Sequence, residues 1–494
     1  METEPGQPTA EVPAEPTDDL VASTHALTIK RRKLAYTATT GRVVLRTEVI
    51  TDGTFDGFKP GAEVFVTAYT VDGADPAKRP VTFAFNGGPG SSSLWLHLGL
   101  LGPRRVRSGD VGDPVPPPYE LVDNLETLLV HSDLVFIDPV STGYSRAVSG
   151  RKPADYHGFQ ADIESVGEVI RLWTSRNGRW MSPKFIAGES YGTTRAAGLA
   201  HHLQYRYGMY FNGLILVSAV LDFGTILFNA GNDLPYALYL PTYAAIAHHH
   251  GRHGDRALAD VLAEAEEYAA RGYPWALARG SRLTDAERAD AVARVASLTG
   301  LTEDYVDRAD LRIEHLRFFT ELLRDRRLVV GRIDGRFTGS DPDAAREHLA
   351  DDPSISAIMG AYTAAQNHYL RTELGYRQDL PYEVLSVSVN GAWSYKEFQN
   401  AHVTVADKLS SVMRANPHLK VHVASGYTDG ATPYFATEHV LAHLAIPADL
   451  RDNIEVAYYP AGHMMYVHEP SRIRQCGDIA AFVTAASNRR GTSE

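Results

Sequence analysis

Ser190, in a Gly-x-Ser-x-Gly motif at residues 188–192, carries the clearest chemical signal in this chain. Strand-forming residues precede the motif at 185–187, and residues 193–203 are compatible with a helix. A serine on a sharp turn from strand to helix is pushed out of the sheet with its hydroxyl exposed, and the flanking glycines remove Cβ atoms that would clash there. This context predicts that Ser190 is a nucleophile.

A serine hydroxyl reacts only when a base takes its proton and a third group orients that base. Asp429 follows the strand-like residues 421–424, and His463 follows the strand-like residues 454–458. Each could have an ordinary role, with Asp429 capping a turn and His463 hydrogen-bonded at the surface. Their order after the serine and their positions at strand ends favour a catalytic acid and base instead.

A glycine-rich turn at residues 86–93 follows another apolar strand and offers backbone donors to a substrate. Two adjacent glycines, Gly87 and Gly88, let the backbone approach a ligand closely, and Pro89 stiffens the turn. A phosphate-binding loop is excluded because no lysine follows the last glycine. The turn therefore suits the stabilisation of a negatively charged reaction intermediate.

Short apolar runs alternate with helical segments such as residues 161–174, a pattern typical of a doubly wound α/β sheet. The first strands, 43–45 and 63–69, alternate in polarity and are predicted to be antiparallel. The later ones are continuously apolar, as buried parallel strands are, at Val81–Phe85, Leu134–Ile137, Phe185–Ala187, Leu214–Val217, Val421–Ala424 and Ile454–Tyr458. The predicted fold class is α/β with a mainly parallel sheet.

The domain organisation expected from this pattern has four parts. Residues 1–24 are rich in Pro, Glu and Thr and are predicted to be a disordered tail. Residues 25–220 and 376–494 form the two parts of the α/β core, separated by a helical cap insertion at residues 221–375. In such folds ligands bind beyond the carboxyl ends of the strands, so this cap is predicted to act as a lid.

Within the insertion, the pattern predicts helices at 255–270, at 311–323 and from a capping box at residues 284–287 to about residue 300. A short hairpin is expected at residues 329–337.

The composition narrows the classes of partner. A net charge of −12 argues against nucleic acid, and no apolar stretch is long enough to span a bilayer. The single cysteine, Cys476, cannot form an intrachain disulfide and has the helical spacing of a core residue. With no basic and apolar leader at the N-terminus, a cytoplasmic location is expected.

No metal site is predicted, because no carboxylate or cysteine has the spacing to complete a set of metal ligands with the histidines at 248–253. We expect no cofactor, and the sequence does not determine the oligomeric state.

Four co-linear motifs resemble the serine carboxypeptidase family, the S10 class of peptidases on an α/β-hydrolase fold. They lie at residues 86–93, 137–145, 188–192 and 461–464. The resemblance implies a serine hydrolase that releases C-terminal residues from peptides with a free C-terminus, through an acyl-enzyme. It implies that Ser190 is the nucleophile, His463 the general base and Asp429 its orienting partner. The oxyanion would bind the N–H groups of Gly88 and Tyr191.

The same resemblance implies that Asn86, Gly87 and Glu189 bind the carboxylate of the substrate. A physical reason supports this role for Glu189, because burial beside the nucleophile should raise its pKa. A protonated Glu189 could donate a hydrogen bond to a carboxylate, whereas an ionised one would repel it. The alternative is that Glu189 merely occupies the variable position of the motif.

Four positions depart from the family pattern. Leu100 stands where the family usually has a second Glu. Ser91 replaces a common Cys, Thr193 a common Gly or Ala, and Tyr466 a common Pro, which together indicate an intracellular, bacterial-type branch. The Leu100 departure keeps an esterase or acyltransferase on the same fold as an alternative, and a catalytically inactive binding module is the third hypothesis.

Overall fold

The computed structural model describes residues 15–107, 109–111 and 114–488. Its centre is a ten-stranded sheet with the order β1-β2-β3-β7-β4-β9-β10-β13-β14, and β8 pairs with β3 beside this path. The strands are β1 Asp19–Ile29, β2 Arg32–Thr51, β3 Thr54–Val71, β4 Val81–Phe85, β7 Asp133–Ile137, β8 Arg146–Ala147, β9 Lys184–Glu189, β10 Gly213–Val217, β13 Lys420–Gly426 and β14 Ile454–Tyr459.

Strand direction divides this sheet into two parts. The pairs from β1 to β7 are antiparallel, as predicted for the strands at 43–45 and 63–69. All pairs from β7 to β14 are parallel. The six predicted parallel strands are therefore confirmed, although β14 at the edge of the sheet is only partly buried, and their carboxyl ends meet at one edge of the sheet.

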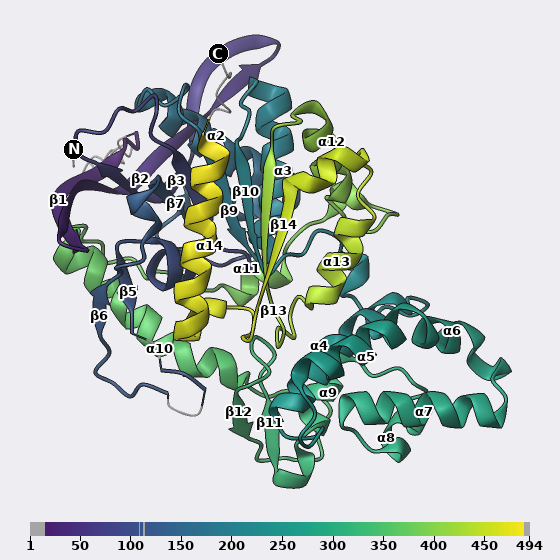
Figure 1. Cartoon of the computed structure of the whole chain (residues 1–494). Coiled ribbons are helices and arrows are strands. Elements are labelled where there is room, and N and C mark those ends of the chain that lie inside the picture. Colours follow the sequence, from purple (N-terminus) through teal and green to yellow (C-terminus); the bar gives the residue numbers. More distant parts are fainter. Residues whose placement is uncertain (1–14, 108, 112–113, 489–494) are drawn as a thin grey trace, which may run out of the picture.

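Successive residues of the parallel strands pack into different layers of the core, as a period of two requires. In β4, Phe83 and Phe85 pack on one face, whereas Ala84 packs on the other. The first face is covered by α2 Phe159–Arg176, α3 Tyr191–Tyr207, α12 Ala406–Ala415 and α13 Tyr434–Ala442. The second is covered by α1 Leu94–Leu96, α10 Pro353–His368 and α14 Glu469–Ser487 (Figure 1). Buried Cys476 lies in α14.

Between β10 and β13, residues 234–340 fold into a mainly helical body below the carboxyl ends of the strands (Figure 1). It has its own apolar core and a short hairpin of β11 Leu328–Val330 and β12 Thr338–Ser340. Its helices are α4 Leu234–His249, α5 Leu258–Ala270, α6 Gly272–Arg279, α7 Asp285–Thr299, α8 Glu303–Arg308 and α9 His315–Glu321. The predicted capping box at Thr284 is present at the start of α7. The predicted hairpin is present too, although its strands flank a turn at residues 331–337.

Two predicted boundaries are wrong. Residues 19–24, assigned to a disordered tail, belong to β1, which pairs with β2 over its whole length. Backbone pairing orders this segment despite its weak apolar content. The rest of the predicted tail, residues 1–14, lies outside the described residues. The expected end of the cap at residue 375 is too late, because α10 and residues 369–374 pack into the core of the α/β body.

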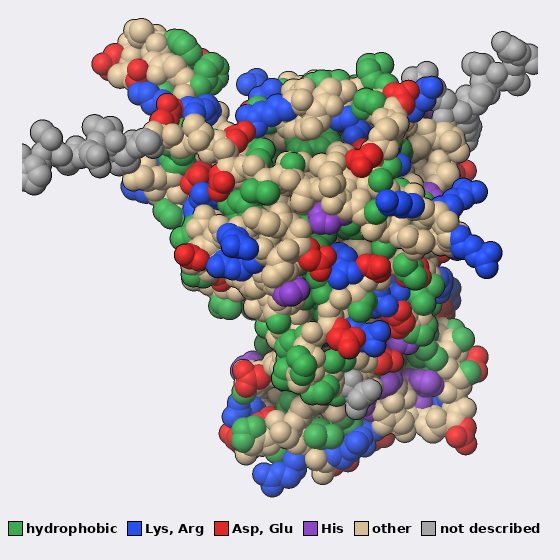
Figure 2. Space-filling model, turned by 90° about the vertical axis from the view of Figure 1, so that its left-hand side faces the viewer, with side chains coloured by type: hydrophobic (Ala, Val, Ile, Leu, Met, Phe, Trp, Pro, Cys, Tyr) green, Lys and Arg blue, Asp and Glu red, His purple; other side chains and the backbone are tan. Residues whose placement is uncertain are grey.

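Three smaller elements also belong to the described chain. They are the antiparallel strands β5 Arg104–Val106 and β6 Leu121–Asp123, and the short helix α11 Val387–Gly391. The outer ends of β2 and β3 form a hairpin that projects from the body, and exposed apolar side chains lie on this projection (Figure 2). Acidic and basic side chains are interspersed on the face that Figure 2 shows. No helix of the described part is long and apolar enough to cross a membrane.

Candidate active site

Ser190 lies on a strained turn between β9 and α3. Its φ of 60° and ψ of −130° are unusual for a residue with a side chain. Its N–H donates to the carbonyl of Val217 on the neighbouring strand β10, at 3.0 Å. A Cβ on Gly188 would lie 2.1 Å from the carbonyl oxygen of Gly192, so the turn closes only with glycine there. The local geometry therefore agrees with that predicted for the motif.

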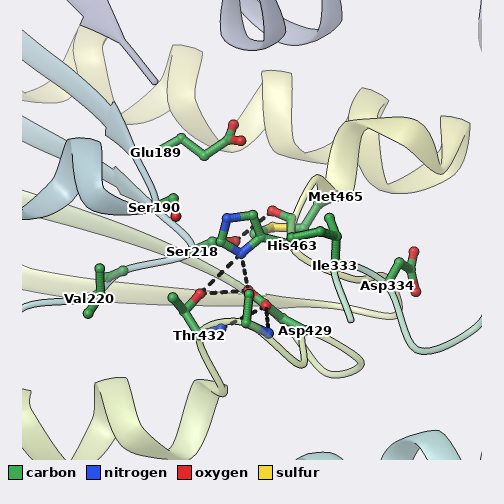
Figure 3. Close-up of polar contacts among 12 residues, drawn as sticks. Glu189, Ser190, Ser218, Val220, Ile333, Asp334, Asp429, Thr432, His463 and Met465 are labelled. Atoms are coloured by element: carbon green, nitrogen blue, oxygen red, sulfur yellow. Dashed lines mark hydrogen bonds and ion pairs between the residues drawn. The ribbon is translucent and has the colours of Figure 1, made fainter. Parts of the chain in front are cut away.

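Asp429 and His463 form a buried hydrogen-bonded pair, with 2.8 Å between Oδ2 and Nδ1. Asp429 is fully buried, and its Oδ1 accepts hydrogen bonds from the N–H groups of Ala431 and Thr432. These donors fix the carboxylate, and the Thr432 hydroxyl also contacts both side chains. The His463 ring lies between Ser190 and Asp429 (Figure 3).

Burial and charge oppose each other at His463. Burial alone would lower its pKa, but the Asp429 carboxylate, its hydrogen bond and Glu189 together hold the pKa above the ordinary value. A proton received by this imidazole would thus be stabilised by Asp429, as a general base requires.

The backbone of His463 is held by both parts of the chain. Its N–H donates to the carbonyl of Ile333 in the turn between β11 and β12, at 2.7 Å. Its carbonyl accepts from the Ser218 hydroxyl, directly after β10, at 2.6 Å. The same turn donates through Gly335 N–H to the carbonyl of Thr428, at 2.9 Å. The helical body and the α/β core therefore meet at the histidine.

The glycine-rich turn lies directly against the start of α3. A Cβ on Gly87 would lie 2.5 Å from the backbone nitrogen of Tyr191, and Gly88 adopts a φ of 100°. Within the described chain, the N–H groups of Gly88 and Tyr191 have no hydrogen-bond acceptor. The helix N-terminus adds a partial positive charge there. These groups are suited to binding an oxyanion.

Glu189 and Asn86 lie beside the nucleophile and are both buried. Burial raises the pKa of Glu189 to about 7, although His463 and a hydrogen bond from Tyr466 lower it in part. The Tyr466 hydroxyl donates to Glu189 Oε2 at 2.7 Å. Asn86 Oδ1 accepts from the N–H of Leu96, whereas its Nδ2 is buried with no partner in the described chain. An unsatisfied buried N–H donor beside a protonatable carboxyl can donate a hydrogen bond to the carboxylate of a ligand.

A cavity of about 450 Å³ joins these groups. Six predicted site residues line it: Asn86, Gly87, Gly88, Glu189, Ser190 and His463. Asp429 lies behind His463, and the backbone of Tyr191 adjoins Gly87. The remaining walls come from both parts of the chain, and include Ser91, Trp95, Arg332, Ile333, Ile355, Leu385, Val387, Asn390, Ala431 and Met464.

Sequence reasoning missed the roles of two residues at this site. Tyr466 was noted only as a departure, yet its ring lies against Gly99, next to Leu100, and its hydroxyl reaches Glu189. The joint change at positions 100 and 466 was the signal that could have identified it. Arg332 belongs to no recognisable sequence motif, and it reaches the cavity wall through the folding of the cap turn.

Comparisons with known proteins agree with this geometry. The serine carboxypeptidase family model matches residues 61–224, which include Asn86, Glu189 and Ser190. This match supports the family resemblance over that range, which ends before Asp429 and His463. No curated protein sequence matches the chain.

Among solved structures, Kex1(Δ)p, a prohormone-processing carboxypeptidase from Saccharomyces cerevisiae, is similar with a TM-score of 0.57. The alignment covers 92% of each chain at 14% identity. The proline iminopeptidase of Mycobacterium smegmatis is 14% identical over 90% of this chain and 98% of its own, with a TM-score of 0.37. The chain thus has the α/β-hydrolase fold.

The packing at the turn predicts the effect of Gly188→Ala. The added methyl group would overlap the Gly192 carbonyl, so we expect a loss of about 1–3 kcal/mol in the free energy of unfolding. Denaturant titration measures it. Gly477→Ala is the matched control, because a Cβ there meets nothing within 4 Å and helix propensity favours alanine. Equal stability of the two variants would contradict the close packing at the turn.

Proposed function

We propose that this protein is a serine-type carboxypeptidase that releases C-terminal residues from peptides. The observation that carries the proposal is the shared cavity. It contains Ser190 and His463 together with Asn86 and Glu189, two groups able to bind a carboxylate. A nucleophile and a carboxylate receptor side by side select the last peptide bond of a chain.

The chemistry follows from the position of each group. Ser190 Oγ would attack the carbonyl carbon of the last peptide bond while His463 takes the hydroxyl proton. The oxyanion would accept hydrogen bonds from the N–H groups of Gly88 and Tyr191. The C–N bond then breaks, His463 passes the proton to the leaving amine, and an ester on Ser190 remains. Water, deprotonated by His463, hydrolyses that ester, while Asp429 orients the imidazole throughout.

Carboxylate recognition depends on the protonation state of Glu189. With a pKa of about 7, the side chain is largely protonated below that pH and can donate a hydrogen bond. Asn86 Nδ2 supplies a second donor. Above pH 7 the ionised Glu189 would repel the substrate carboxylate, so recognition weakens as the pH rises.

An esterase or acyltransferase is the second candidate, and one observation favours it. Leu100, which replaces the usual Glu, is fully buried and is not among the described residues that line the cavity. The carboxylate receptor therefore has one acidic group fewer than the family pattern implies. Tyr466 hydrogen-bonds Glu189 from the same region but supplies no acidic group in place of the missing one.

A cytoplasmic location is part of the proposal. It rests on the single cysteine, Cys476, which is buried and reduced.

The decisive experiment compares a peptide that has a free C-terminus with its C-amidated form. We expect the free peptide to be cleaved at least ~10-fold faster, because only it can use both donors of the carboxylate receptor. Ser190→Ala should lower kcat by more than ~1000-fold. Release of the last residue is followed by mass spectrometry. Equal rates on the two peptides, or turnover of esters alone, would favour the second candidate.

Glu189→Gln tests the protonation model. Because glutamine donates a hydrogen bond at every pH, we expect the decline of kcat/KM above about pH 7 to disappear for free-carboxylate peptides. The decline at acidic pH should persist, since it reports protonation of His463, whose pKa is raised. The C-amidated peptide serves as the control substrate. An alkaline decline that persists unchanged in the variant would refute the role of Glu189.

Tyr466→Phe provides an independent test of the same group. The Tyr466 hydroxyl lowers the pKa of Glu189, so its removal should raise that pKa and move the alkaline decline to higher pH. In the Glu189→Gln background, Tyr466→Phe should leave the pH profile unchanged. A shift to lower pH, or an equal shift in both backgrounds, would show that Tyr466 acts in another way.

A further inference from the structure

Arg332 places a positive charge in the wall of the active-site cavity without an acidic partner. The residue is half-buried, and its guanidinium makes no hydrogen bond or ion pair with any residue in the described ranges. Its neighbour Arg336 differs, because Arg336 is buried and pairs with Asp334 at 2.6 Å. Of these two arginines, Arg332 is the one whose charge has no partner among the described residues and is left for a ligand.

The turn that carries Arg332 is held from several sides. The N–H groups of Arg332 and Ile333 both donate to the Asp352 carboxylate, at 3.2 Å. The Ile333 carbonyl accepts from His463 N–H, and a Cβ on Gly430 would lie 2.8 Å from the Arg332 carbonyl oxygen. The start of the side chain is therefore fixed relative to the catalytic groups, which favours specific recognition over loose attraction.

Arg332 and the carboxylate receptor occupy different parts of the cavity. Glu189 and Ile333, the neighbour of Arg332, lie on different sides of the His463 ring (Figure 3). Arg332 belongs to the turn between β11 and β12, so it lines the cavity from the cap side. A carboxylate bound at Arg332 is thus a second one, distinct from the carboxylate at Asn86 and Glu189.

The other described residues that line the cavity include no lysine and no second arginine. Apolar side chains such as Trp95, Ile355 and Leu385 surround the site and lower the local dielectric. In such surroundings a guanidinium prefers a carboxylate that it can bind through two parallel hydrogen bonds.

We propose that Arg332 determines substrate specificity by binding the carboxylate of an acidic side chain, Asp or Glu, in a residue beside the scissile bond. This inference rests on the proposed carboxypeptidase function. The substrates would be peptides with an acidic residue in the last or the penultimate position.

The test compares N-acylated dipeptides that carry Glu or Gln, or Asp or Asn, in one of these two positions. Each pair is nearly isosteric and differs mainly in charge. For one position we expect the wild-type kcat/KM to be at least ~10-fold higher on the acidic peptide, the size of effect that a charge-assisted hydrogen bond gives. The position that shows the difference identifies the subsite.

Arg332→Met keeps much of the length but removes the charge, and it should abolish this preference while leaving the rate on neutral peptides within ~3-fold. Arg332→Lys should retain part of the preference, because it keeps the charge but not the two-pronged geometry. Arg326→Met is the matched control, since Arg326 is exposed and does not line the cavity. Thermal unfolding of each variant shows that it is folded.

The outcomes separate the two proposals. Equal wild-type rates on Glu and Gln peptides in both positions would overturn the role of Arg332 while leaving the carboxypeptidase function standing. A loss in Arg332→Met that is equal on acidic and neutral peptides, but absent on amidated ones, would assign Arg332 to the terminal carboxylate and also overturn it. If no peptide is cleaved, the carboxypeptidase proposal fails, and p-nitrophenyl esters of glutarate and butyrate then decide. An Arg332-dependent preference for the glutarate monoester supports the role of Arg332, and equal rates refute it.

Discussion

The close approach of three backbone segments around Ser190 is the constraint on which this site depends. The turn after β4, the end of β9 and the first residues of α3 meet at distances that exclude a Cβ on Gly87, Gly188 and Gly192. The left-handed conformation of Ser190 costs about 1–3 kcal/mol, which the surrounding packing must offset. In return, Ser190 lines the cavity, and the N–H groups of Gly88 and Tyr191 are left without an acceptor in the described chain.

The cap insertion contributes to the active site through its backbone as well as its side chains. The hydrogen bond from His463 N–H to the Ile333 carbonyl joins the cap turn to the proposed general base. The same turn brings Arg332 into the wall of the cavity that Asn86 and Glu189 also line. The cavity therefore contains Glu189, whose neutral form burial favours, and the Arg332 guanidinium, a cation with no anionic partner among the described residues. These two electrostatic environments would orient a substrate that bears two carboxylates.

Much of the fold followed from short-range pattern. Apolar runs identified all six parallel strands, because strands covered on both faces are rich in apolar residues; β14, at the edge, carries an exposed Glu455. The capping box at Thr284 could also be predicted from a few neighbouring residues. The errors arose where pairing with a distant segment decided the outcome. Residues 19–24 looked disordered but are ordered by the β2 ladder, and α10 looked like cap but packs on the α/β core.

The sequence by itself determined which residues lie together at the site. The motif around Ser190, and the positions of Asp429 and His463 after later strands, were sufficient to predict this because the carboxyl ends of parallel strands must meet at one edge of the sheet. Tertiary structure alone decided the environment of those groups. The hydrogen bond of Tyr466 to Glu189 spans 277 positions, and the place of Arg332 depends on how the cap turn packs on the core. Burial, pKa and unpaired charge are properties of packing between distant segments, so no local pattern encodes them.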